Sequence, residues 1–162
     1  MSDELKPGDE APLFTLPSSE GGKIDLSSYR GKNDVILYFY PKDDTPGCTK
    51  EGCNFRDAFS ELKKGKGAVL GVSLDPLESH QKFIQKYDLP FPLLSDEDAA
   101  VSKAYGVYKL KNMYGKKFWG IERSTFLIGK DGRLIKIFRR VKVDQHLDEV
   151  LSALQEAQAG RK

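Results

Sequence analysis

Two apolar runs in the first half of the chain indicate two buried strands, with a helical pattern between them. The runs, Val35–Tyr40 and Ala68–Leu74, are short and continuous, as in strands that are covered on both faces. After the first run, Phe55, Phe59 and Leu62 follow one another at steps of four and three residues. This spacing places them on one face of a helix, so the pattern predicts a buried strand, a helix and a second buried strand.

Shorter patterns predict the other elements. The Asp131-Gly132 dipeptide between strand-like segments 124–128 and 134–140 predicts a tight turn and a hairpin. The remaining predicted elements are an N-terminal hairpin of segments 14–16 and 23–26, a helix over Leu77–Tyr87, a strand over Phe91–Ser95, a short helix over Ala99–Tyr105 and a terminal helix with an apolar stripe at Leu147, Val150, Leu151 and Leu154. The alternation of strands and helices predicts an α/β fold, with helices on both faces of a mixed sheet. A length of 162 residues without an evident linker predicts a single domain over residues 1–162.

The only two cysteines, Cys48 and Cys53, lie between the first apolar run and the helical pattern that follows it. Thr45 suits the N-cap of this helix and Pro46 suits its first position, which puts Cys48 in the first turn. There, unpaired backbone N–H groups and the helix dipole favour a thiolate over a thiol. Because the thiolate is the nucleophilic form, the sequence predicts a reactive cysteine at position 48.

The spacing of the two cysteines restricts how they can pair. In an intact α-helix, the Cα atoms of residues five apart are separated by roughly 8.6 Å. A disulfide rarely tolerates more than about 7 Å, so a bridge would require the turn to unwind. A thiol pair that cycles through local unfolding therefore fits the spacing better than a static cross-link does. Position and spacing alone leave a second interpretation open, in which both cysteines are small buried hydrophobic residues that never react.

Three motifs resemble one protein family. Pro41-x-x-x-Thr45-x-x-Cys48 is similar to the active-site motif of the peroxiredoxins, thiol peroxidases built on a thioredoxin-like fold. The string 45–57 resembles the bacterioferritin comigratory protein or peroxiredoxin Q branch, and the run 114–128 is similar to the second signature of that branch. With the opening segment 6–12, the resemblance covers nearly the whole chain. Gly52 departs from the motif, where alanine is expected. The resemblance implies a thioredoxin-like fold whose mixed β-sheet is flanked by helices and extended by an N-terminal β-hairpin.

The resemblance also implies roles for five residues. Cys48 would be the peroxidatic cysteine, whose thiolate attacks the peroxide and becomes a sulfenic acid. Cys53 would be the resolving cysteine, which forms an intramolecular disulfide with Cys48. Thr45 would hydrogen-bond the thiolate and the peroxide, Pro41 would shield the sulfur from water, and Arg123 would stabilise the thiolate and the charge that develops on the transferred oxygen.

Composition and charge narrow the range of partners. With 26 Lys and Arg residues against 24 Asp and Glu residues, the net charge of +2 gives no reason to expect a nucleic-acid partner. No apolar stretch reaches the length of a membrane span, and the charged first residues lack the apolar core of a secretory signal. We therefore expect a cytoplasmic protein without membrane partners. No motif for a flavin, haem, nicotinamide or metal cofactor is evident, so electrons would arrive from thioredoxin or a similar dithiol partner. The branch that the chain resembles is often monomeric, which favours a monomer.

Two histidines and three aromatic residues receive no role from the resemblance. Neither His80 nor His146 has metal-ligand spacing to another histidine or cysteine, so we expect both to be surface or capping residues. Tyr114, Phe118 and Trp119 would either line the rim of a substrate site or pack beneath a loop.

The preferred function is a cysteine-dependent peroxidase that reduces hydrogen peroxide and organic hydroperoxides without a bound cofactor. One alternative is a general thiol–disulfide oxidoreductase, although its cysteines would more typically be separated by two residues. Another alternative is a redox-sensing binding protein, in which the disulfide alters a surface that a partner recognises.

Overall fold

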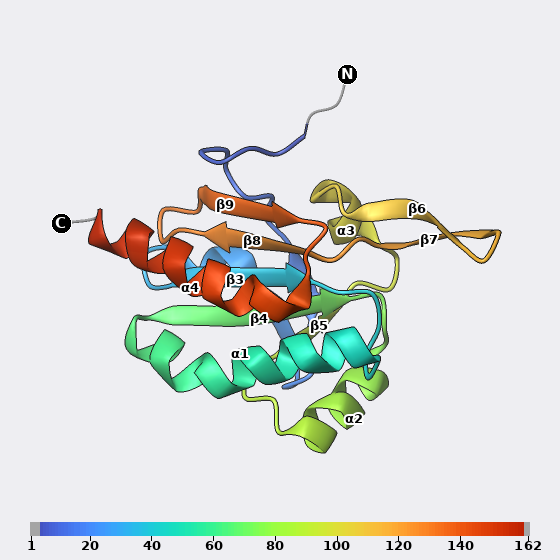
Figure 1. Ribbon diagram of the computed structural model, residues 1–162. Helices are drawn as coiled ribbons and strands as arrows, with labels where there is room; N and C mark the ends of the chain where they lie inside the picture. The colour runs from blue at the N-terminus through green and yellow to red at the C-terminus, as the bar shows by residue number, and fades with distance from the viewer. Residues whose placement is uncertain (1–3, 161–162) are drawn as a thin grey trace.

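Strand β3 (Asp34–Phe39) runs through the centre of the molecule, and all of its residues are buried. The computed structural model describes residues 4–160, so the predicted domain boundaries of 1–162 extend beyond the described residues at both ends. The elements are arranged as Figure 1 shows. In chain order, the other elements are β1 (Thr15–Pro17), β2 (Lys23–Asp25), the 3-10 helix η1 (Leu26–Tyr29), α1 (Pro46–Lys64), β4 (Gly67–Ser73), α2 (Leu77–Tyr87), β5 (Leu93–Ser95), α3 (Ala100–Ala104), β6 (Tyr108–Met113), β7 (Lys116–Ile121), β8 (Ser124–Ile128), β9 (Leu134–Arg139) and α4 (Val143–Ala159).

Five of the strands form one mixed sheet in the order β5-β4-β3-β8-β9. The pairs β3–β4 and β4–β5 are parallel, whereas β3–β8 and β8–β9 are antiparallel. Strands β1 and β2 form the predicted N-terminal hairpin, and a bridge from Ser18 to Leu94 joins the hairpin to the β5 edge. The predicted α/β architecture with a mixed sheet is confirmed. Helix α2 has the predicted bounds, and the other predicted strands and short helix start and end within one or two residues of their expected positions.

The alternation of side chains along β3 divides the core into two layers, because successive residues of a strand point to opposite faces. Val35, Leu37 and Phe39 belong to the cluster on the η1 and α3 side of the sheet. Ile36 and Tyr38 belong to the other cluster, together with side chains of α1, α2 and α4. Helices α1 and α4 lie side by side in front of the sheet in Figure 1, and each is amphipathic. The central strand of the sheet therefore requires a continuous apolar run, because both of its faces are buried.

The hairpin of β6 and β7 was not predicted. Its turn, Tyr114-Gly115, has positive φ at both residues, as in the tight turns that match the twist of paired strands. The hairpin projects from the body of the molecule in Figure 1. Tyr114 is 98% exposed, and Phe118 and Trp119 are also exposed, so of the two interpretations of these aromatic residues, packing beneath a loop is wrong.

Both histidines are buried, which contradicts the expectation that they are surface or capping residues. His146 lies on the side of α4 that faces the sheet, and its Nε2 is 2.7 Å from the hydroxyl of Thr125 in β8. Burial lowers the pKa of His146, and Glu149 only partly opposes this effect. A histidine that packs against Phe55 and Phe138 carries no distinctive spacing in the sequence, which explains the error.

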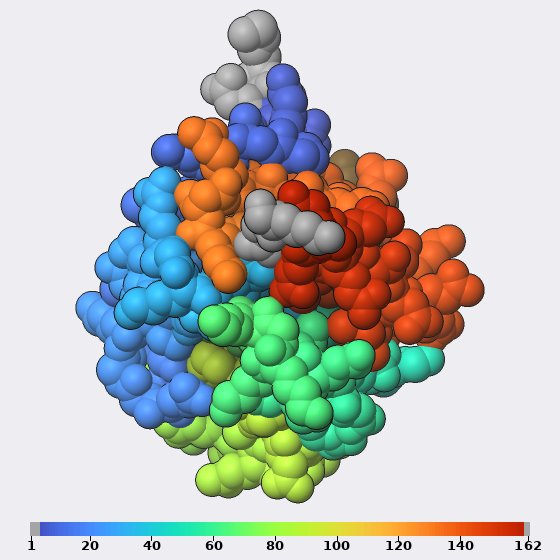
Figure 2. Space-filling model, turned by 90° about the vertical axis from the view of Figure 1, so that its left-hand side faces the viewer, coloured from blue at the N-terminus to red at the C-terminus, as the bar shows by residue number. Residues whose placement is uncertain are grey.

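Figure 2 shows the end of the molecule where the C-terminal part of α1, the β8–β9 turn and the end of α4 lie close together, beside the N-terminal segments drawn in blue. Gln158 of α4 ties this end together, because its side-chain amide donates to the Gly65 carbonyl and to the Asp34 carboxylate. The start of α1 lies at the other end of the sheet. No helix within residues 4–160 is long and apolar enough to cross a membrane.

Candidate active site

Cys48 lies in the first turn of α1, directly beyond the carboxyl end of β3. Thr45 is the N-cap in an extended conformation and Pro46 is the first helical residue, as predicted. The Thr49 N–H donates to the Thr45 carbonyl at 2.8 Å, which closes the first turn around the cysteine. Cys48 is 1% exposed, and its thiol is free. The free backbone N–H groups of this turn create a positive potential that favours a thiolate.

Arg123 reaches Cys48 because of the antiparallel pairing of β3 and β8. Phe39 at the end of β3 is paired with Ser124 at the start of β8. Arg123 directly precedes Ser124 and therefore lies at the carboxyl end of β3, next to the start of α1. Its Nη2 donates to the Cys48 sulfur at 3.2 Å. A Cβ atom on Gly47 would lie only 3.0 Å from Nη2, so the absence of a side chain there gives the guanidinium room.

Glu51 holds the other arm of the same guanidinium. It lies three residues after Cys48, on the same side of α1. Arg123 Nη1 donates to Glu51 Oε1 at 2.6 Å, and the Glu51 and Arg123 side chains are 2% and 15% exposed. Burial alone would lower the pKa of Arg123, but the charges of Glu51 and Cys48 outweigh it and raise that pKa. The guanidinium is therefore a permanent cation that is shared between a sulfur and a carboxyl group.

Burial raises the pKa of Glu51 to about 7, although the charge and hydrogen bond of Arg123 oppose this rise. Within residues 4–160, both Glu51 Oε2 and the Tyr38 hydroxyl are buried without a hydrogen-bond partner. Burial raises the pKa of Tyr38 strongly, and the negative charges of Glu51 and Cys48 add to the effect. Tyr38 is thus a neutral wall of the site at physiological pH.

A second cation lies near this group on the projecting hairpin. Lys111 of β6 is half-buried, and its aliphatic chain passes over Gly120, where a Cβ atom would lie 3.6 Å from Lys111 Cδ. Burial lowers the pKa of Lys111, the charge of Arg123 lowers it further, and Cys48 opposes both effects. Lys111 of the β6–β7 hairpin therefore lies within electrostatic reach of the sulfur.

Thr45 and Pro41 lie in the loop that leads from β3 to α1, and both are half-buried. The Thr45 hydroxyl donates to the Lys42 carbonyl at 2.9 Å and makes no side-chain cap to the helix. The structure therefore brings Cys48 and Arg123 into direct contact, whereas it places the Thr45 hydroxyl in a hydrogen bond within its own loop.

Cys53 is half-buried in the same continuous helix, and its thiol is free. The helix is intact from Pro46 to Lys64, so the two sulfurs cannot join without a local opening. Gly52, the departure from the family motif, is buried between the cysteines. A Cβ atom at this position would lie 3.6 Å from Leu89 Cδ2 and 3.9 Å from Phe83 Cζ, which is ordinary packing distance.

Hydrogen bonds attach the chain to the end of α2 at two points, one before α1 begins and one after Cys53. Before the helix, Asp44 has a positive φ of 58° and accepts hydrogen bonds from Lys86 Nζ and from the Tyr87 hydroxyl, both at 2.9 Å. After Cys53, Arg56 Nη1 donates to the Tyr87 carbonyl at 2.7 Å. The two cysteines thus lie between two attachments to the same corner of the fold.

A cluster of three side chains has the residue types of a metal site. Asp43, Asp75 and His80 each offer one ligand atom, and these three atoms lie within 4.8 Å of one another. These atoms already have partners. Asp43 accepts from the Tyr40 and Ser79 hydroxyls and lies 2.7 Å from His80 Nδ1. We therefore interpret the cluster as a buried hydrogen-bond network that fastens α2 to the loop after β3.

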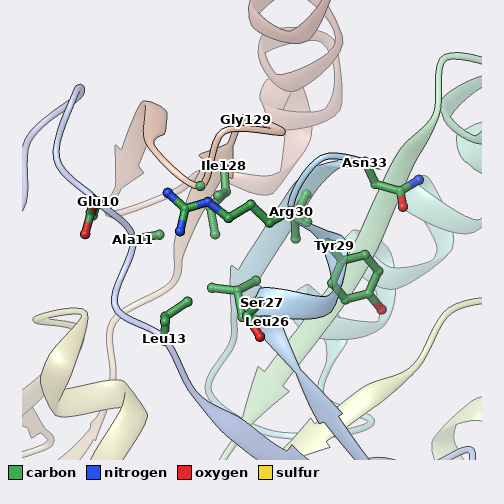
Figure 3. A pocket seen from close by; sticks show the side chains of 12 residues that line it. Glu10, Ala11, Leu13, Leu26, Ser27, Tyr29, Arg30, Asn33, Ile128 and Gly129 are labelled. Atoms are coloured by element: carbon green, nitrogen blue, oxygen red, sulfur yellow. The ribbon is translucent and has the colours of Figure 1, made fainter.

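A pocket that is separate from these residues lies near the start of β3. It is lined by Leu13, Leu26, Arg30 and Ile128, among others, and Figure 3 shows the Arg30 side chain extending across it. Because Cys48 follows the opposite end of β3, this pocket is not part of the cysteine site.

Sequence reasoning missed Glu51, although a signal was present. An acidic residue three positions after a cysteine in the first turn of a helix shares its face, and a buried carboxyl group there needs a cation. Tyr38 could not be identified in this way, because an aromatic residue in a buried strand is ordinarily a core residue.

Comparisons with known proteins agree with this geometry. The AhpC/TSA family model matches residues 7–137. A Coxiella burnetii protein that carries the name peroxiredoxin bcp is 54% identical over 150 residues, which cover 93% of this chain and 99% of that protein. Peroxiredoxin Bcp of Bacillus subtilis is 48% identical over 149 residues, with coverage of 92% and 94%.

Solved structures give the same result. A structure of Xanthomonas campestris bacterioferritin comigratory protein, described in connection with alkyl peroxide reduction, has a TM-score of 0.84 and 44% identity, and covers 90% of this chain and 92% of its own. A cysteine-to-serine mutant of Xylella fastidiosa PrxQ has a TM-score of 0.88 and 39% identity, with coverage of 99% and 100%. The predicted thioredoxin-like peroxiredoxin fold is confirmed. The chain therefore belongs to the AhpC/TSA family and is a peroxiredoxin, a thiol peroxidase, of the Bcp or peroxiredoxin Q group.

Proposed function

We propose that Cys48 is the peroxidatic cysteine and Cys53 the resolving cysteine of this peroxidase, which reduces hydrogen peroxide and organic hydroperoxides. The observation that carries the proposal is the 3.2 Å contact between Arg123 Nη2 and the Cys48 sulfur in the first turn of α1. Two independent sources of positive potential, the helix terminus and the guanidinium, meet at this sulfur. Both favour the thiolate that the reaction needs.

In the first step, the Cys48 thiolate attacks one peroxide oxygen. The S–O bond forms while the O–O bond breaks, and water or an alcohol leaves after the leaving oxygen has taken up a proton. Arg123 Nη2 already points at the sulfur, so it also lies close to the oxygen that is transferred. A donor that is held in place before the reaction stabilises the developing charge without reorganisation. Pro41 shields the site from water, and the Thr45 hydroxyl turns from the Lys42 carbonyl to the substrate.

In the second step, the first turn of α1 opens and Cys53 attacks the sulfenic acid of Cys48. The disulfide forms and a hydroxide ion leaves. An external dithiol then reduces the disulfide, and thioredoxin is the proposed donor. We further propose that the protein works as a monomer in the cytoplasm.

Glu51 acts in this scheme as a positioning residue for Arg123. Its Oε1 fixes Nη1 of the guanidinium, so that Nη2 is directed at the sulfur. With a pKa of about 7, Glu51 carries only part of a negative charge at neutral pH, so it draws less of the Arg123 charge away from Cys48 than a fully ionised carboxylate would.

The two cysteines should be separable by kinetics. Cys48→Ser should abolish peroxide consumption, because a hydroxyl group is far less acidic and nucleophilic than a thiol. Cys53→Ser should be oxidised once at the wild-type rate and then stop at the sulfenic acid. Stopped-flow oxidation with a thioredoxin recycling system measures both steps, and equal first-turnover rates in wild type and Cys48→Ser would remove the mechanism.

Arg123→Met should slow the first oxidation by about two to three orders of magnitude, the usual loss when one donor to a developing oxyanion is removed. Arg123→Lys should recover only part of the rate, because one ammonium group cannot bind the sulfur and Glu51 Oε1 as a planar fork does. The second-order rate constant of the first stopped-flow phase tests both variants. Arg133→Met, at an exposed turn, is the matched control, and an unchanged rate in Arg123→Met would refute the assigned role.

Gly52→Ala should slow disulfide formation. Alanine is favoured over glycine within a helix by about 0.5–1 kcal/mol, which corresponds to roughly a two- to fivefold slower opening. The added methyl group would also contact Leu89 and Phe83, which stabilises the closed helix further. The first phase of oxidation should not change. Stopped-flow traces and mass spectrometry of sulfinic acid measure the two effects, and resolution as fast as in wild type would mean that Gly52 does not control the opening.

Glu51 should make stability depend on pH. Its folded-state pKa of about 7 is raised above the ordinary value of 4.5. Its contribution is thus fully present below about pH 4.5 and is lost as the pH rises through 7, with an upper limit of about 3 kcal/mol. Glu51→Gln should therefore show a smaller fall in the free energy of unfolding between pH 4.5 and 8, measured by denaturant titration of the reduced protein. Glu61→Gln, an exposed position of the same helix, should retain the wild-type slope, and an equally steep slope in Glu51→Gln would contradict the analysis.

A further inference from the structure

Arg56 occupies a position in α1 that the peroxidase mechanism does not yet use. It lies three residues after Cys53, so the two side chains are neighbours on the helix surface. Its side chain is only 33% exposed, which is low for an arginine on a helix surface. Two hydrogen bonds hold the guanidinium: Nη1 donates to the Tyr87 carbonyl at 2.7 Å, and Nε donates to Asp57 Oδ1 at 3.0 Å.

The Tyr87 carbonyl is an acceptor that favours a cation. Tyr87 is the last residue of α2, and the carbonyl groups in the last turn of a helix carry the negative end of the helix dipole. Arg56 therefore joins α1 to the end of α2 at a point just beyond Cys53. In the part of α1 that follows Cys53, Phe55, Ala58 and Leu62 are buried in the core. These contacts hold this part of the helix against the rest of the fold.

The charges around Cys53 come from three elements of structure. On α1, Asp57 lies four residues after Cys53 and is paired with Arg56, while Lys50 lies three residues before Cys53 and is paired with Asp144 of α4. Asp88 caps the end of α2. The hydrogen bond to Asp57 raises the pKa of Arg56, and the negative charges of Cys53 and Asp88 contribute to the same effect. The Arg56 guanidinium is thus part of the charged surroundings of Cys53.

We propose that Arg56 is a positioning residue for the resolution step, and this inference rests on the proposed role of Cys53. Its guanidinium keeps a positive charge beside the Cys53 sulfur, while its bond to the Tyr87 carbonyl holds that part of α1 in place as the turn around Cys48 opens. Arg56 would then do for the second thiol what Arg123 does for the first, but from the side of the helix that does not move.

The step that Arg56 assists is the attack of the Cys53 thiolate on the sulfenic sulfur of Cys48. The S–S bond forms, the S–O bond breaks, and the leaving hydroxide takes a proton from solvent to become water. No electron donor is needed, because Cys53 is oxidised as the sulfenic acid of Cys48 is reduced. Because only the thiolate attacks, a cation beside Cys53 increases the rate at a pH where most free thiols are protonated.

Four variants test the proposal through the second phase of stopped-flow oxidation. At pH 7, Arg56→Met should slow this phase by about three- to tenfold, the loss of thiolate that follows removal of a nearby cation. Arg56→Lys should recover most of the rate, and Asp57→Asn should increase it about twofold because a competing negative charge is removed. Lys64→Met, in the last turn of the same helix, is the control and should match wild type. The first phase should be unchanged in all four.

The pH dependence separates a charge effect from a purely structural one. The defect of Arg56→Met should shrink as the pH rises, because a neighbouring cation matters less to thiolate attack in alkaline solution. In a Cys48→Ser background, alkylation of Cys53 by iodoacetamide should follow the same order of rates, and this assay involves no peroxide. A defect in Arg56→Met that is the same at every pH, or that Arg56→Lys does not relieve, would overturn the proposal. If the wild-type protein showed no first phase of oxidation, the proposed peroxidase mechanism would be overturned instead. The relative rates of Cys53 alkylation in the variants would then still decide the role of Arg56.

Discussion

One guanidinium group, that of Arg123, is shared between a sulfur and a carboxyl group that are both removed from water. Cys48 and Glu51 are almost completely buried, and neither could carry a negative charge there without a cation at hydrogen-bond distance. Burial alone raises the pKa of Glu51, and this effect exceeds the opposing effect of Arg123. The two anionic groups therefore compete for one cation. In the proposed mechanism the competition favours Cys48, because Glu51 is partly protonated at neutral pH.

The fold is the means by which this contact is made. A parallel strand pair joined by a helix places the first turn of α1 at the carboxyl end of β3, where the helix dipole points at the site. The antiparallel strand β8 on the other side of β3 starts at the same end, which brings Arg123 to the cysteine. A sheet of purely parallel strands would place the end of that neighbouring strand there instead. The mixed topology thus brings together residues that are 75 positions apart in sequence.

The sequence was sufficient to predict the strands whose residues are apolar because they are buried. The strands on either side of α1 are buried on both faces, and their uninterrupted apolar runs predicted them within one residue. The β6–β7 hairpin was missed for the converse reason. It is mostly exposed, so no core constrains its composition, and its Tyr-Gly turn is not among the strongest turn signals. In the site, helix-start signals located Cys48, whereas Arg123 was found only by resemblance to a family. Glu51 and Arg56 were missed because their proposed roles depend on tertiary partners, the Arg123 guanidinium and the Tyr87 carbonyl.

A helix that carries both cysteines must satisfy two opposing requirements. Cys48 needs the intact first turn, because the turn supplies the positive potential and keeps the sulfur beside Arg123. The proposed disulfide needs that turn to open, because roughly 8.6 Å separates the Cα atoms in a closed helix. A helix that was too stable would leave the sulfenic acid exposed to further oxidation, and one that was too weak would lose the thiolate site. In the proposed mechanism, Gly52 lowers the cost of opening within the turn itself, while the attachments at Asp44 and Arg56 confine the opening to the residues between them. The segment that must unwind is therefore short, and the rest of α1 remains packed on the sheet.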